Sequence, residues 1–252
     1  MPGVALGQIL AQATGAAFLL WYLRSRRGRL RLVFKPVPIR RSLFWDILKV
    51  GAVACLSPLQ SVLTMLLMAG FVAHLGVLPL AGYAIGQRLE FLMSTVAFGI
   101  GLASVPMVGM AIGAGDVPRA RRIAWTAGTV TAAMLTLVGL VVASHPDLWA
   151  AIFTRDAAVL DYSRRYLRVA GPAFGFFGFG LTLYFASQGA GRMVGPVFAA
   201  TLRLLLVAAV GSWLVAIDAP AWQLFALAAA AMVVYGSTCA VALKLDRWGG
   251  AR

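Results

Sequence analysis

Residues 82–124 read GYAIGQRLEFLMSTVAFGIGLASVPMVGMAIGAGDVPRARRIA. This stretch is a long apolar run that begins with Arg88 and Glu90 and ends in a glycine-rich turn. The turn is followed by three arginines, which are Arg119, Arg121 and Arg122. About 20 apolar residues in helical form are enough to cross the hydrocarbon core of a bilayer. Because the charges gather at its two ends, the stretch predicts a membrane-spanning helix with a defined direction.

The composition of the whole chain indicates a membrane protein. Of its 252 residues, 61% are hydrophobic and 12% are charged, whereas about a quarter of the residues of a soluble domain are charged. Runs such as LLVAAVGSWLVA (205–216) do not alternate apolar with polar residues, so they favour helices over barrel strands. We therefore expect an all-α, polytopic membrane protein with seven transmembrane helices. The apolar blocks lie at about 3–23, 47–72, 81–112, 123–143, 168–187, 194–217 and 221–243.

The positive charge of the chain is concentrated beside the first apolar block. The net charge is +14, and nine of the 22 bases lie between Arg24 and Lys49. Such a segment is typical of an orientation signal or a contact with anionic lipid. Nucleic-acid binding is disfavoured because the sequence has no recognition motif. The positive-inside rule places loop 24–46, the arginines after the glycine-rich turn, and the C-terminal tail in the cytoplasm, and segment 144–168 outside.

Two short glycine motifs predict tight turns at the cytoplasmic ends of helices. Gly113 and Gly115 are suited to the left-handed conformation that closes a helix. Asp116 can then cap the next helix, with a proline in its first turn. A similar motif recurs about 76 residues later in FASQGAGRMVGP, as Gly189, Gly191 and Arg192. The two motifs suggest an internal repeat of helix hairpins, although so short a similarity is also compatible with coincidence.

The charges of Arg88 and Glu90 allow two interpretations. Residues two apart on a helix do not face each other, so we expect them to have different neighbours. One interpretation is a pair of charges at the outer, interfacial start of a helix. The other is a gate or coupling carboxylate, because ionisable groups inside a membrane tend to be functional. We favour a structural or gating role at the outer face.

The sequence offers little that would support catalysis. It has no Ser-His-Asp set, paired carboxylates or Cys/His cluster of the kind that an intramembrane enzyme uses. The two cysteines lie in apolar blocks. We therefore expect a carrier or channel, with no catalytic residues, metal or cofactor.

Several stretches resemble the multidrug and toxin extrusion (MATE) family. The segment LAGYAIGQRLEFLMSTVAFGIGLASVPMVGMAIGAGDVPRARR is similar to the family's eighth helix and the following cytoplasmic loop. GVALGQILAQ resembles the start of the sixth helix, FTRDAAVLDYSRRYLRVAGP the approach to the tenth, and SQGAGRMVGPVFAATLRL the turn between the tenth and eleventh. The resemblance covers nearly the whole chain, in the family's order.

The resemblance implies a domain organisation and a function. Members have twelve helices in two lobes, so residues 1–23 would be the sixth helix, 24–45 a basic cytoplasmic loop between lobes, and 46–245 the second lobe. The five helices before the sixth, and with them the first lobe, would be missing. The intact protein is expected to be a multi-pass exporter of the bacterial inner membrane that exchanges H+ or Na+ for amphipathic compounds. The alternatives are a lipid-precursor flippase of the same superfamily and a non-transporting remnant.

The resemblance also suggests where this half would contact a substrate. Where one branch of the family has a coupling Glu in the seventh helix and an Asp in the tenth, this chain has Gln60 or Ser61 and Phe176 or Phe177. The cavity wall would therefore be mostly apolar. For each Met and Phe taken singly, simple helix packing is favoured over substrate contact. The candidate substrate contacts are polar or adaptable side chains: Ser57, Gln60, Met65, Met68, Phe91 and Phe98.

Overall fold

The computed structural model describes residues 2–24, 41–246 and 248, and the chain divides into two units, 1–45 and 46–252. The first unit contains helix α1 (Pro2–Arg24). These bounds agree with the predicted helix at 3–23. Most of the basic segment expected to be a cytoplasmic loop between lobes, residues 25–40, lies outside the described residues.

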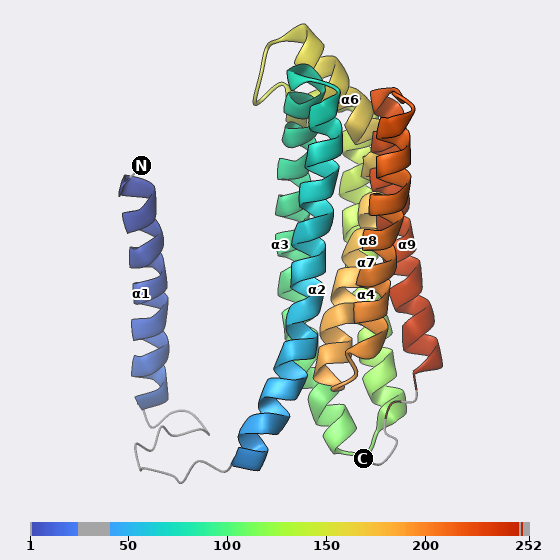
Figure 1. The fold of residues 1–252 in the computed structure, drawn as a ribbon. Coiled ribbons are helices and arrows are strands. Elements are labelled where there is room, and N and C mark those ends of the chain that lie inside the picture. Colours follow the sequence, from blue (N-terminus) through green and yellow to red (C-terminus); the bar gives the residue numbers. More distant parts are fainter. Residues whose placement is uncertain (1, 25–40, 247, 249–252) are drawn as a thin grey trace. The chain divides into compact units, whose positions relative to one another are not determined.

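The second unit is a bundle of long helices that run alternately in opposite directions (Figure 1). Within the described residues, six segments are long and apolar enough to cross a membrane. This confirms the expectation of an all-α, multi-pass membrane protein. The helices are α2 (Arg41–His74), α3 (Val77–Gly113), α4 (Val117–Ser144), α5 (Asp147–Ala150), α6 (Ala157–Ala170), α7 (Phe174–Gly189), α8 (Val194–Ala216) and α9 (Ala221–Leu245).

One membrane helix begins earlier than predicted. The sequence placed it at 168–187 after an outer loop, but α6 already begins at Ala157 and continues through a 3-10 turn (Gly171–Ala173) into α7. Hydropathy did not indicate α6 because its outer surface is charged and ion-paired. Arg164 lies 2.6 Å from Asp147, and Arg165 lies 2.7 Å from Asp161. Pro172 lies in the 3-10 turn between the two helices.

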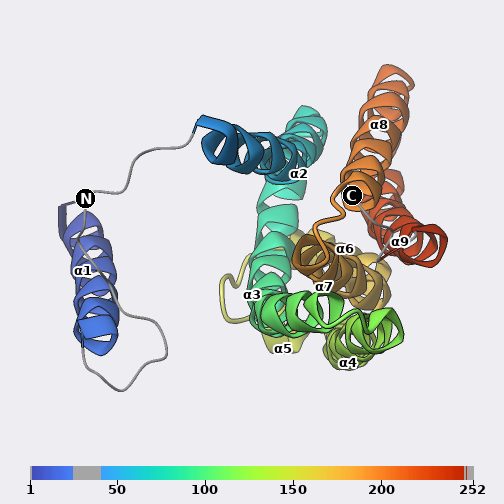
Figure 2. The ribbon, with the colours of Figure 1, turned by 90° about the horizontal axis from the view of Figure 1, so that it is seen from below.

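Helix α7 is the centre of the bundle. It packs against α3, α4 and α9, while α8 packs mainly on α9, and the end-on view shows α7 between these neighbours (Figure 2). The core contains large side chains such as Tyr166, Phe174 and Phe225, which are fully buried. Where α4 passes the 3-10 turn, a Cβ atom on Gly139 would lie only 2.0 Å from the carbonyl oxygen of Gly171. Glycine at this crossing lets the two backbones touch, as small residues do between membrane helices.

The two glycine turns have the same hydrogen bonds. Gly113 and Gly189 are the last residues of α3 and α7, so our prediction of a left-handed conformation was wrong for Gly113. The left-handed residues are Gly115 (φ 75°) and Gly191 (φ 67°). In each turn the next backbone N–H donates to a carbonyl five residues earlier, at 2.9 Å. This is the 6→1 bond of a Schellman motif, and it satisfies a carbonyl at the helix end.

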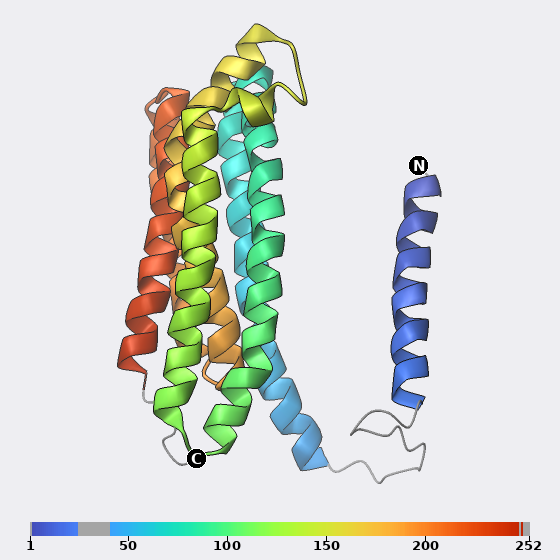
Figure 3. The same cartoon turned by 180° about the vertical axis from the view of Figure 1, so that it is seen from behind.

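The first of these turns joins α3 to α4, which lie beside each other in the view from behind (Figure 3). Asp116 caps α4 by accepting a hydrogen bond from the Arg119 backbone N–H at 3.0 Å, which confirms the predicted cap. Arg119 and Arg122 are exposed, as is Arg192 in the second turn. Arg121 is half-buried and donates to the backbone carbonyl of Asp246.

Candidate functional site

A cavity of about 520 Å³ lies within the second unit, between α2, α3, α7, α8 and α9. Its wall is mostly aromatic and aliphatic, with a few hydroxyl, amide and charged groups. Five of the six predicted substrate contacts line it, and their binding role remains a prediction. They are Ser57, Met65, Met68, Phe91 and Phe98.

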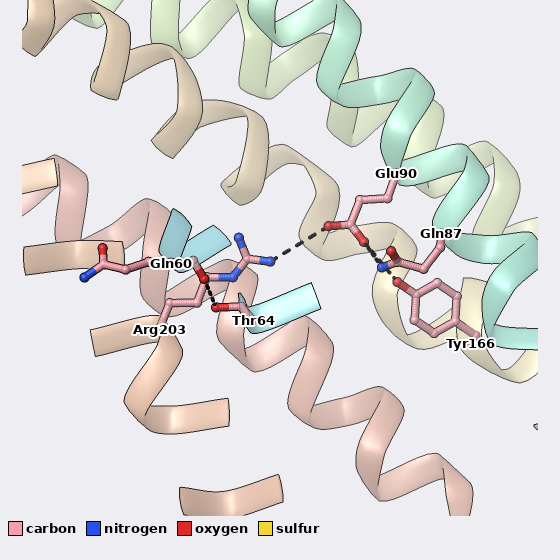
Figure 4. A network of polar contacts seen from close by, with 6 residues as sticks. All are labelled: Gln60, Thr64, Gln87, Glu90, Tyr166 and Arg203. Atoms are coloured by element: carbon pink, nitrogen blue, oxygen red, sulfur yellow. Dashed lines mark hydrogen bonds and ion pairs between the residues drawn. The ribbon is translucent and has the colours of Figure 1, made fainter. Parts of the chain in front are cut away.

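The sixth predicted contact, Gln60, is directed toward a neighbouring helix. Its amide nitrogen donates to the Thr201 hydroxyl on α8 at 2.7 Å, and Gln60 is not among the residues that line the cavity. Its backbone carbonyl accepts from the Thr64 hydroxyl at 2.8 Å. Gln60 thus connects α2 to α8. In the close-up its amide lies away from the charged residues (Figure 4).

Glu90 lies deeper in its helix than the sequence suggested. Because α3 begins at Val77, Glu90 is thirteen residues into the helix, about 20 Å from its start at 1.5 Å per residue. Its side chain is 12% exposed and lines the cavity. The expectation of a charge at the helix start was therefore wrong.

Arg88 and Glu90 do have different neighbours, as predicted. The Arg88 guanidinium lies over the Phe153 ring, 4.9 Å from its centroid. Arg88 is outside the cavity wall and is exposed. Its cation–π contact joins α3 to the segment that follows α5, which is consistent with a structural role for this arginine.

Three side chains surround the Glu90 carboxylate (Figure 4). The Gln87 amide donates to Oε2 at 2.8 Å, and the Tyr166 hydroxyl donates to the same oxygen at 3.4 Å. On the other side, Nη2 of Arg203 lies 3.9 Å from Oε1. Side chains from α3, α6 and α8 therefore meet at one partly buried carboxylate.

Arg203 is the counter-charge of Glu90, and the sequence analysis did not identify it as part of the site. It lies in the middle of α8, and its guanidinium stands 5.3 Å from the centroid of the Phe177 ring and 5.6 Å from that of Tyr235. Such aromatic faces attract a cation electrostatically. The available sequence signal was a single base inside an apolar block, which in a membrane helix indicates a functional or paired residue.

Two of the positions at which the resemblance implied coupling acids in one branch of the family lie in this cavity wall, and both are uncharged. Ser61 and Phe177 line the cavity, in the regions that resemble the seventh and tenth helices. Phe177 instead supports Arg203 with its ring. Among the described lining residues, the acid is Glu90 and the base is Arg203.

Comparison with known proteins gives the family. The family model described as MatE matches residues 54–214, which include α3, α4, α6, α7 and most of α2 and α8. The chain belongs to the MatE family. This confirms the family that the sequence resembled. Glu90, Arg203 and the cavity-lining residues of α2, α3, α7 and α8 fall within the matched region, whereas the part of the wall that α9 contributes lies beyond it.

The curated relatives and solved structures agree with this assignment. "Probable multidrug resistance protein NorM" of Thermotoga maritima is 26% identical over 195 residues, covering 77% of this chain and 42% of that protein. The protein of the same name from Aromatoleum aromaticum is 30% identical over 150 residues, 60% of this chain and 32% of that protein. The solved "MATE transporter ClbM in complex with Rb+" has a TM-score of 0.79 at 21% identity and covers 98% of this chain and 54% of its own.

A second solved structure gives the same result. The Vibrio cholerae MATE transporter VcmN in the bent form has a TM-score of 0.81 at 20% identity, covering 94% of this chain and 53% of its own. The chain thus spans about half the length of the solved transporters, and 42% or less of the curated relatives it matches.

Proposed function

We propose that the chain is the second lobe, with the helix that precedes it, of a cation-coupled exporter of amphipathic organic compounds in the bacterial inner membrane. Membership of the MatE family supports this, as do the multidrug-resistance names of the relatives. The coverage of about half of each solved transporter supports the assignment to one lobe.

The cavity is the observation that carries the proposal. Its Met and Phe side chains form a wall that can repack around ligands of different shape, because the unbranched Met side chain is flexible and polarisable. The charged groups of the described wall are Glu90 and Arg203, and the Gln87 amide, which also lines the cavity, donates to the Glu90 carboxylate. A largely apolar cavity with a few convergent polar groups is the usual form of a small-molecule site.

In the proposed mechanism this cavity wall faces a corresponding wall on the first lobe. The two lobes rock about the shared cavity, and binding of H+ or Na+ in one state changes the affinity for the exported compound. We place the coupling ion in the first lobe. The positions at which the resemblance implied coupling acids in one branch are uncharged here, and Glu90 already has the Arg203 guanidinium as its counter-charge.

Neither alternative function has a specific observation in its favour. A flippase for a pyrophosphate-linked lipid would need several bases in its cavity, whereas the described wall offers Arg203, which is compensated by Glu90. A non-transporting remnant would not require a cavity with a compensated charge pair at membrane depth, where charges are costly to maintain.

The proposal can be tested by reconstitution in liposomes with an imposed proton or sodium gradient. We expect the 252-residue chain alone to insert without driving uptake of a cationic dye. The same chain extended by a first lobe encoded upstream in frame should drive uptake that an ionophore abolishes. Ionophore-sensitive uptake by the chain alone would overturn the half-transporter assignment. Failure of the extended protein to move any of a panel of amphipathic dyes would overturn the exporter assignment.

A further inference from the structure

The charges in the cavity wall cancel each other without forming a direct hydrogen bond. Glu90 and Arg203 are each 12% exposed, and their nearest side-chain atoms are 3.9 Å apart. A charge-assisted N–H···O hydrogen bond would be about 1 Å shorter. The two side chains therefore compensate each other's charge without a direct hydrogen bond. A charged group of a ligand can approach either of them without first breaking such a bond.

Each ion also has contacts that do not depend on the other. Gln87 and Tyr166 donate hydrogen bonds to the Glu90 carboxylate. The rings of Phe177 and Tyr235 support the Arg203 guanidinium. Within the described part of the chain, Arg203 Nε has no hydrogen-bond partner, so the guanidinium retains unused donor capacity. Both charges can remain in place while a ligand contacts them.

This arrangement discriminates between ligands by their charge. A monocation that engages Glu90 would weaken the compensation of Arg203, and a monoanion on Arg203 would do the same to Glu90. An uncompensated charge in a low-dielectric site is strongly unfavourable. A ligand that carries both charges can engage both residues and leave neither one uncompensated.

We infer that this cavity selects amphipathic zwitterions, with the cationic group at Glu90 and the anionic group at Arg203, over monocations and monoanions of the same skeleton. The apolar part of the compound would lie against Met65, Phe91 and Phe98, which line the same cavity. The inference rests on the proposed function in taking this cavity as the place where the exported compound binds.

Three fluorescent probes with one skeleton test this. Nε-dansyl-lysine is a zwitterion, dansylcadaverine is the same molecule without the carboxylate and is a monocation, and Nα-acetyl-Nε-dansyl-lysine is a monoanion. Binding to the purified 252-residue chain in lipid nanodiscs is followed by the dansyl emission. We expect the zwitterion to bind about tenfold more tightly than either monovalent probe, since a hydrogen bond to a charged group is worth about that factor.

Variants assign the selectivity to the two residues. With Arg203→Gln, Glu90 is uncompensated and the monocation should become the tightest ligand. With Glu90→Gln, the monoanion should take that place. The double variant Glu90→Gln/Arg203→Gln has no uncompensated charge, so it keeps the test open if a single variant fails to fold. It should bind the three probes without ranking them by charge. Arg155→Gln, at an exposed position outside the cavity wall, should keep the wild-type order.

Two results would overturn the inference: a wild-type chain that binds dansylcadaverine as tightly as the zwitterion, or a double variant that retains the wild-type order. The binding assay is independent of transport. If the extended protein fails to export any dye while the chain keeps the predicted order, the proposed function is wrong and the zwitterion site stands. If the extended protein exports a dye but the chain does not bind the zwitterion most tightly, the zwitterion inference is wrong and the proposed function stands.

Discussion

The Tyr166 hydroxyl lies 3.4 Å from the Glu90 carboxylate although the two residues are 76 positions apart in the chain. Tyr166 belongs to α6, the N-terminal part of a broken helix, and Glu90 to the wall of the cavity. The Tyr166 ring packs edge-on against Tyr83 and Phe225, with centroids at 5.1 and 5.4 Å. One side chain therefore contributes both to the core and to the charged site.

These two contributions of Tyr166 can be separated by substitution. Tyr166→Phe removes one long hydrogen bond and keeps the ring, so we expect a loss of about 1 kcal/mol in the free energy of unfolding. Tyr166→Ala also empties a fully buried site and should cost about 3–5 kcal/mol. Equilibrium unfolding in mixed detergent measures both. Equal losses for the two variants would show that the hydroxyl, and not the ring, carries the stability.

The Glu90–Arg203 pair should show strong coupling in a double-mutant cycle. Arg203→Gln leaves a largely buried carboxylate, 12% exposed, without its counter-charge and should destabilise the chain by up to about 3–5 kcal/mol. The double variant with Glu90→Gln removes both charges and should recover most of that loss. The same unfolding assay gives the coupling energy. Additive losses would mean that the two side chains act independently at 3.9 Å.

Gly139 should tolerate no side chain. A methyl group there would meet the Gly171 carbonyl oxygen at 2.0 Å, so Gly139→Ala has to separate α4 from the 3-10 turn at a cost of about 1–3 kcal/mol. The matched control is Gly99→Ala on α3, where nothing lies within 4 Å. That change should be neutral or stabilise the helix by up to about 1 kcal/mol. Similar thermal midpoints for the two variants in detergent would contradict this description of the crossing.

In a complete transporter, Glu90→Gln should lower the transport rate or the expression level without removing ion dependence. The reason is that Glu90 is already engaged by Gln87, Tyr166 and Arg203. Dye efflux from cells is measured with and without a pH or sodium gradient. A well-expressed variant that still moves the dye but no longer responds to either gradient would identify Glu90 as the coupling acid.

The membrane orientation can be tested with a matched pair of arginines. Arg192 lies in the turn between α7 and α8, and Arg155 lies in the segment before α6. The positive-inside rule places the first in the cytoplasm and the second outside. In a background without Cys55 and Cys239, Arg155→Cys should react with an impermeant thiol reagent in intact cells, and Arg192→Cys only in inverted vesicles. Labelling of Arg192→Cys from outside would reverse the topology.

Much of the fold could be predicted because its signals are local. Apolar blocks of membrane-spanning length located the long helices, and the position of Asp116 predicted a cap. The start of α6 could not be found in this way. Helix α6 carries arginines that pair with aspartates of α5 and of α6 itself. A prediction from hydropathy alone assigns so charged a segment to a loop.

The site was less predictable because it depends on contacts between distant helices. The resemblance to the family and the polar or adaptable side chains of α2 and α3 gave most of the predicted cavity contacts. The direction of Gln60 toward Thr201 depends on where α8 lies, and the sequence does not give that position. The same holds for the pairing of Glu90 with Arg203, which requires α3 and α8 to face each other across the cavity.

The two glycine turns restrict how this lobe can move. From Gly113 to Val117 the chain can span at most about 14 Å, and from Gly189 to Val194 at most about 18 Å, because an extended residue covers about 3.5 Å. Both connecting turns are too short to let the joined helix ends separate widely, and each is held by its own backbone hydrogen bonds. The ends of α3 and α4 that the first turn joins must therefore move together, as must the ends of α7 and α8 that the second turn joins. Any opening of the lobe on that side has to occur between these two tethered hairpins rather than within either one.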